Sequence, residues 1–72
     1  MEEKERLRIV LKHLIEHNEG HAEDYKRWVG LARTSGMEEV AGLIAQAGEH
    51  VEKASSALGK ALGLIGQPPS WK

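Results

Sequence analysis

Two long heptad repeats, separated by one short break, constrain the fold of this chain more than any other feature of its sequence. In residues 2–33, side chains recur at alternating steps of four and three, at Leu7, Leu11, Leu14, Asn18, His21, Tyr25, Trp28 and Ala32. In residues 37–65, the same spacing joins Val40, Ile44, Ala47, Val51, Ala54, Leu58, Ala61 and Ile65. This pattern is typical of helices that pack along a seam. We therefore predict two long helices over these ranges.

Residues 34–36 should reverse the chain. Ser35 and Glu38 have the spacing of a capping box, in which the hydroxyl accepts a hydrogen bond from the Glu38 N–H and the carboxylate reaches back. Alternatively, Gly36 ends the first helix in the left-handed conformation. Within that helix, Gly20 costs only about 1 kcal/mol relative to alanine, so we expect the helix to continue across it, with a bend at most.

The ends of the chain are less regular. Gly66 should end the second helix, and the two prolines that follow prevent the helix from resuming. We expect residues 67–72 to form a flexible tail. The hairpin domain would then comprise residues 1–66.

Composition excludes several classes of protein. The 72 residues include no cysteine, which excludes disulfides and thiolate metal sites. With 10 basic and 11 acidic residues, the chain has no charge excess that would favour nucleic acid or anionic lipid. Residues 2–8 are mostly charged, unlike a signal peptide, and no apolar run reaches membrane-spanning length. We expect a cytoplasmic, all-α protein.

Two helices joined by a short turn form an antiparallel hairpin, and both predicted helices have apolar faces broader than one seam. Additional apolar residues flank the seams at Val10, Ile15, Val29, Leu31, Leu43, Ala57 and Leu64. A single hairpin cannot cover faces of this width. We therefore predict that the chain pairs with itself, as a twofold homodimer, to form a four-helix bundle.

Polar residues interrupt the first repeat at its middle. His17 and His21 are four residues apart and share a helix face, which Asp24 continues. Because both helices rise equally per residue, a reversal at residues 35–36 places His50 level with His21. Imidazoles with a carboxylate suit zinc, nickel, cobalt or copper(II). We predict a metal site formed by His17, His21, His50 and Asp24, with His13, Glu16, Asn18 and Glu49 in supporting or peripheral positions.

A second interpretation of the same residues involves no metal. Histidine and asparagine at seam positions can fix helix register at some loss of stability, and Asn18 is the best candidate for this role. The protein would then be a non-catalytic interaction or scaffold module. We leave this alternative open beside the metal-binding prediction.

No enzymatic activity is predicted. Residues 13–17 match the H-x-x-E-H pattern of inverted zinc peptidases, but those enzymes need a further ligand and a large catalytic domain. The Glu-x-x-His motif of ferritin-like di-iron bundles is absent, because the residues three before each histidine are not glutamate. We find no nucleophile–base pair in the sequence.

The motif I-E-H-N-x-x-H-x-x-x-Y-x-x-W at residues 15–28, followed by G-x-x-x-V-A at residues 36–41, resembles small uncharacterised helical-hairpin proteins of bacteria and archaea. The resemblance covers most of the two predicted helices. It implies a stand-alone helical protein and no established activity.

Overall fold

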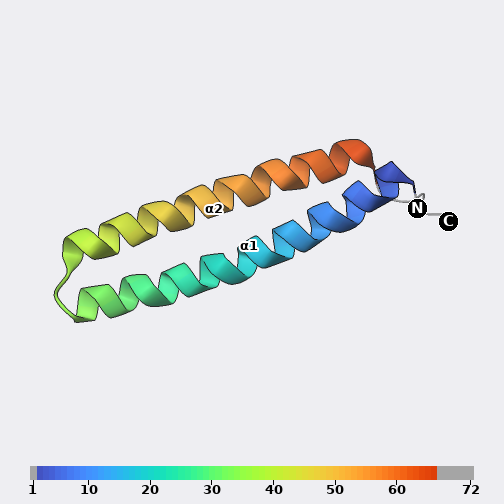
Figure 1. Ribbon diagram of the computed structural model, residues 1–72. Helices are drawn as coiled ribbons and strands as arrows, with labels where there is room; N and C mark the ends of the chain where they lie inside the picture. The colour runs from blue at the N-terminus through green and yellow to red at the C-terminus, as the bar shows by residue number, and fades with distance from the viewer. Residues whose placement is uncertain (1, 67–72) are drawn as a thin grey trace, which may run out of the picture.

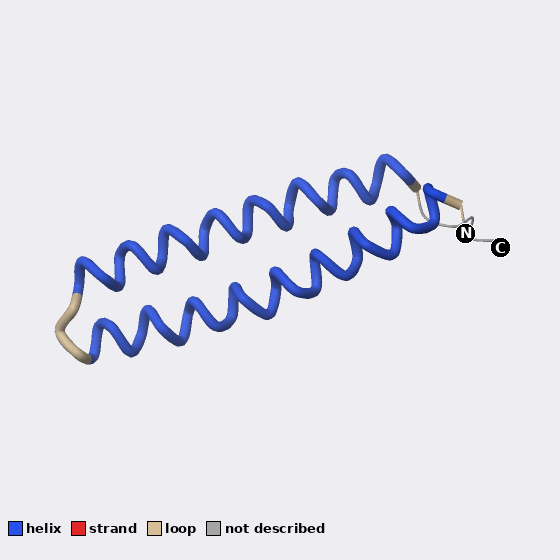
Figure 2. Tube along the Cα trace, in the orientation of Figure 1, coloured by secondary structure: helices blue, strands red, loops and turns tan. Residues whose placement is uncertain are grey.

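The computed structural model describes residues 2–66 and contains two helices, α1 (Glu3–Thr34) and α2 (Glu38–Ile65). The helices run antiparallel and are joined by one short turn (Figures 1 and 2). The prediction of an all-α hairpin is thus confirmed. α1 continues without interruption through Gly20. The predicted flexible tail, residues 67–72, lies outside the described residues.

The turn is built on Gly36, the second of the two alternatives that the sequence offered. Gly36 has φ 77°, its N–H donates to the Arg33 carbonyl, and the Met37 N–H donates to the Ala32 carbonyl at 2.8 Å. This pair of bonds is the Schellman motif, which satisfies carbonyls left free at the end of α1. A left-handed residue at this position favours glycine because glycine has no Cβ.

The predicted capping box is wrong. Ser35 is the C-cap residue of α1, and its N–H donates to the Leu31 carbonyl, whereas α2 begins after Met37, which makes no side-chain capping bond. Because Gly36 redirects the chain after Ser35, the serine hydroxyl is not placed over the first N–H groups of α2. Glu38 instead lies 3.6 Å from Arg33 across the turn, and both side chains are exposed.

The helices contact each other along a seam that differs in part from the predicted one. We call it the inner seam. On α1 its buried and half-buried positions are Arg8, Leu11, Ile15, Asn18, Ala22, Tyr25, Val29 and Ala32. On α2 they are Ala41, Ile44, Gly48, Val51, Ser55, Leu58, Leu62 and Ile65. Every second predicted position is replaced by the residue that follows it, so that, for example, Ile15 and Ala22 replace Leu14 and His21.

The inner seam produces only a small core. Among the described residues, Leu11, Ala32 and Ala41 are the ones that are buried, and no large side chain is completely enclosed. The hairpin is a rod with extents of 53 × 23 × 17 Å. A structure with so little enclosed volume leaves most of its apolar side chains in contact with water.

Two further observations concern the ends and the length of the helices. At the open end of the hairpin, the Arg8 Nε donates to the Gly66 carbonyl at 2.9 Å, which satisfies a backbone group at the end of α2. Neither α1 nor α2 includes a stretch that is both long enough and apolar enough to cross a membrane.

Candidate functional site

The histidines of α1 form a pair on the surface of the helix. The Nε2 atoms of His17 and His21 are 2.9 Å apart, and their ring centroids are 4.4 Å apart at an interplanar angle of 86°. Four-residue spacing brings the two rings onto one face of α1. One imidazole donates and the other accepts in this contact. Both side chains are exposed.

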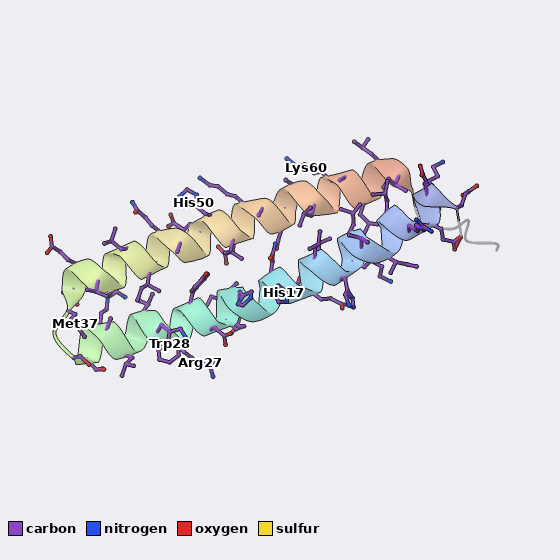
Figure 3. The ribbon with its side chains drawn as sticks, in the orientation of Figure 1. His17, Arg27, Trp28, Met37, His50 and Lys60 are labelled. Carbon is purple, nitrogen blue, oxygen red and sulfur yellow. The ribbon has the colours of Figure 1, made fainter. Side chains whose placement is uncertain are left out.

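Of the other predicted ligands, Asp24 lies beside this pair and lines the same surface hollow on α1, whereas His50 does not. Asp24 forms an ion pair with Arg27 on its own helix. His50 is exposed on α2 and projects away from α1 (Figure 3). Of the supporting residues, His13, Glu16 and Glu49 are exposed, and Asn18 is half-buried in the inner seam.

The predicted metal site is therefore wrong. Within residues 2–66, no group of three or more histidine, aspartate or glutamate side chains is arranged so that it could hold a metal ion. His17, His21 and Asp24 lie near one another on α1, but His50 on α2 does not join them.

Packing along the inner seam explains why His50 does not join the side chains on α1. His17, His21 and His50 each precede an inner-seam position, so their side chains lie beside the seam and not in it. The level of His50 along the hairpin axis, relative to His21, also differs from the prediction. Tyr25 lies against Gly48, which places His50 about half a helical turn away from the level of His21.

The idea that buried histidines fix the helix register also needs correction. None of the described polar or charged residues is buried. His17, His21 and His50 are exposed, so they cannot set the pairing of α1 with α2 from inside the hairpin. Asn18 is the one member of the predicted set that lies in the inner seam.

The most distinctive surface feature is a second heptad stripe on each helix, one residue before each inner-seam position. We call the two stripes together the open face. On α1 it comprises Leu7, Val10, Leu14, His17, His21, Asp24, Trp28 and Leu31. On α2 it comprises Val40, Leu43, Ala47, His50, Ala54, Ala57, Ala61 and Leu64. Of the ten large hydrophobic residues exposed within residues 2–66, eight belong to the open face.

Both stripes lie on the same side of the hairpin. Stepping back one residue rotates the side-chain direction by about 100° around a helix axis. α1 and α2 run in opposite directions, so these rotations have opposite senses when both helices are viewed from one end. Because the two inner seams point toward each other, the opposite rotations turn both stripes to one common side.

The open face is apolar at its two ends and polar in its middle. Leu7, Val10 and Leu64 lie near the open end of the hairpin, and Trp28 and Leu43 lie near the turn. Figure 3 shows Trp28 on the surface of α1, and its side chain is 52 % exposed. The histidines and Asp24 occupy the stretch between these apolar ends. The sequence signal for this face was the group of apolar flanking residues, which the predicted seam did not accommodate.

The opposite side of the hairpin has a different character. It is rich in charged and small residues, including Lys12, Glu19, Glu23, Gly42 and Glu52. A shallow cavity of about 280 Å³ opens there beside Tyr25, with charged residues at its edge. The exposed apolar surface is therefore concentrated on one side, which makes the open face the candidate functional site.

The fold and this surface define a class of protein, an antiparallel helical hairpin with one apolar side. A family described as a domain of unknown function (DUF8180) matches residues 7–65, and the chain belongs to this family. The match spans both helices and the turn. No curated protein and no solved structure matches the chain.

Proposed function

We propose that this protein acts as a non-catalytic association module, which uses its open face to pair with a second copy of itself in a four-helix bundle. The observation that carries the proposal is the position of the exposed apolar side chains. Eight large ones lie on a single side of a hairpin whose own core is minimal. A concentration of exposed apolar side chains on one side typically marks a protein–protein interaction site.

The energetics support burial of this face. Complete burial of a leucine or valine side chain contributes about 1.5–3 kcal/mol. On the open face, Leu14 is 43 % exposed, Leu43 is 66 % exposed and Leu64 is 89 % exposed. About half of that contribution at most open-face positions, and most of it at Leu64, is still available to an association step.

The pattern of polar residues also supports self-association. Polar side chains interrupt the open face in its middle and the apolar residues flank them, so the face has the same order when read from either end. Two copies can therefore cover apolar ends with apolar ends and polar middles with polar middles. A surface that matches itself in this way is what a twofold interface requires.

The test compares two residues of equal exposure on opposite sides of α1. Leu7 belongs to the open face, and Ile9, which follows an inner-seam position, lies on the opposite side; both are 51 % exposed. We expect sedimentation equilibrium of the natural sequence to give twice the 8.0 kDa chain mass. Leu7→Gln should shift the protein toward the monomer, and adding Trp28→Gln should shift it further, whereas Ile9→Gln should leave the dimer intact.

Thermal unfolding provides a second readout. Because association couples to folding, the melting temperature of a dimer rises with protein concentration. A folded monomer whose melting temperature does not change over a wide range of micromolar concentrations would refute the proposal. An equal effect of Ile9→Gln and Leu7→Gln on the dimer would show that the open face is not the interface.

A further inference from the structure

From the arrangement of large and small residues on the open face, we infer that the two copies stack with both turns at the same end, so that α1 of each copy packs on α2 of its partner. This inference rests on the proposed function, because it specifies the geometry of that self-association. Two hairpins can cover each other's open faces in two ways. A twofold axis along the rod puts both turns at one end, and an axis across the rod puts them at opposite ends.

The two helices contribute unequal side chains to the open face. On α1 the stripe is bulky, with three leucines, a valine, a tryptophan and two histidines. On α2 the middle of the stripe is small, with alanine at residues 47, 54, 57 and 61. If each α1 packs on the partner's α2, bulky residues face small ones and both pairs of helices are separated by similar distances. If α1 packs on the partner's α1, bulky residues face bulky residues there, and alanines face alanines where α2 packs on the partner's α2.

Heights along the rod can be read from the inner seam. Tyr25 lies against Gly48, so Trp28, three residues further along α1, is level with the region between Leu43 and Ala47. An axis along the rod keeps the same levels in the partner. Trp28 then faces the partner's Leu43 and the partner's Ala47, and Leu14 falls between the partner's Ala57 and the partner's Ala61. Trp28 and Leu14 are thus each placed beside at least one alanine, as close packing requires.

The charged residue of the open face favours the same arrangement. Asp24 is level with residue 49 of α2, next to His50. With both turns at one end, Asp24 and His50 alternate around the four helices, so that each carboxylate lies between imidazoles. With turns at opposite ends and the rods in full overlap, Asp24 instead faces the partner's Leu14. A carboxylate desolvated against leucine is unfavourable, whereas imidazole can donate a hydrogen bond to it.

The experiment uses spin labels, because the natural chain contains no cysteine that would interfere. Ser35→Cys places one label at the exposed turn of each copy, and Glu5→Cys places one near the open end. Double electron–electron resonance then measures the distance between the two labels of a dimer. With both turns at one end, both variants should give distances on the order of 20–30 Å, set by the spacing of neighbouring helices and the label length.

The opposite result has a clear signature. Turns at opposite ends would separate the labels by about the length of the rod, which is 53 Å, in both variants. A dimeric mass with this long distance would overturn the inference and leave the proposed function intact. A monomeric mass without any dipolar coupling would refute the proposed function itself, and the inference with it.

An exchange of charges provides an independent check. Asp24→His and His50→Asp, made separately, should each weaken the dimer by roughly tenfold, because each places like groups side by side. The double variant should restore affinity close to that of the natural sequence. Equal loss in the single and double variants would contradict the alternation of Asp24 and His50. The exposed exchange Glu23→Lys with Lys26→Glu, on the opposite side of α1, serves as the control.

Discussion

Tyr25 of α1 packs against Gly48 of α2: the Tyr25 Cβ lies 3.4 Å from the point that a Cβ on Gly48 would occupy. The Tyr25 Cδ2 and Cγ atoms lie 3.7 and 3.9 Å from the same point, so the tyrosine side chain packs against Gly48. This contact fixes the height of one helix relative to the other. It also explains why the inner seam contains Gly48 and not the neighbouring Ala47 that the heptad pattern favoured.

Substitution at Gly48 should depend sharply on side-chain size. We expect Gly48→Ala to raise the free energy of unfolding by up to about 1 kcal/mol, because its Cβ meets Tyr25 at an ordinary contact distance and alanine favours the helix. Gly48→Leu should lower it by about 1–3 kcal/mol through overpacking. Urea denaturation measures both. Gly42→Leu, at a site with nothing within 4 Å, is the control and should cause no loss. A stable Gly48→Leu variant would contradict the contact.

The bond from Arg8 to the Gly66 carbonyl should stabilise the open end of the hairpin. Arg8 is half-buried, and its cationic group lies at the end of α2, where the helix dipole is negative. We expect Arg8→Met to cost about 1–2 kcal/mol in the free energy of unfolding, as is typical of hydrogen bonds to charged groups. Amide hydrogen exchange should show that the loss is greatest in the last turn of α2.

The matched control for this prediction is Arg6→Met. Arg6 is exposed two residues earlier on α1, so its substitution should change stability by less than about 0.5 kcal/mol. If both variants lose the same amount, the effect of Arg8→Met comes from general charge and not from the bond to Gly66.

Gly36 should resist substitution by any residue that carries a Cβ. Its φ of 77° lies in the left-handed region, where L-residues pay about 1–2 kcal/mol. Gly36→Ala should therefore destabilise the protein by about 1 kcal/mol, and Gly36→Asn by less, because asparagine tolerates this conformation. Gly30→Ala, inside α1 with no atom within 4 Å, should have the opposite sign. Calorimetric melting curves of the three variants test the order.

Ser55 should be a destabilising element of the inner seam. Its hydroxyl is buried and has no hydrogen-bond partner among the residues that the structure describes. Removing an unpaired buried polar group recovers its desolvation cost, so Ser55→Ala should raise the free energy of unfolding by about 1 kcal/mol or more. The neighbouring Ser56 is exposed, and Ser56→Ala should give only the smaller gain that comes from helix propensity.

The comparison between adjacent serines isolates the effect of burial on the free energy of unfolding, because the chemical change is identical in both variants. Equal gains at the two positions would mean that the Ser55 hydroxyl is satisfied in solution. Unfolding in urea at one fixed protein concentration keeps any contribution from self-association constant between the variants.

Much of the fold could be predicted from local signals. Long heptad repeats with one glycine-containing break specify two helices and a reversal, because helix propensity and apolar spacing are properties of neighbouring residues. Gly36 was recognised as a possible helix end for the same reason. The capping box failed because Ser35 and Glu38 satisfy a spacing rule, while the backbone geometry of the turn places Ser35 at the C-cap of α1.

The candidate site was predicted less well, and the cause lies in the heptad pattern itself. The predicted and inner seams share every second position, including Leu11, Asn18, Tyr25 and Ala32, and differ by one residue at the others. Both choices are compatible with apolar spacing on helices as broadly apolar as these. A difference of one residue decides whether His21 faces the other helix or the solvent.

The sequence by itself determined the two helices, the place of the reversal and the excess of apolar surface, since each follows from residue type and spacing along the chain. Only the tertiary structure decided which stripe of each helix faces inward and which residues of α1 are level with His50. It also decided that the remaining apolar stripes lie on one side of the hairpin. These depend on the close fit of Tyr25 against Gly48, which is a contact between residues far apart in sequence. Steric fit of this kind is absent from any local pattern, because it arises when two backbones approach each other.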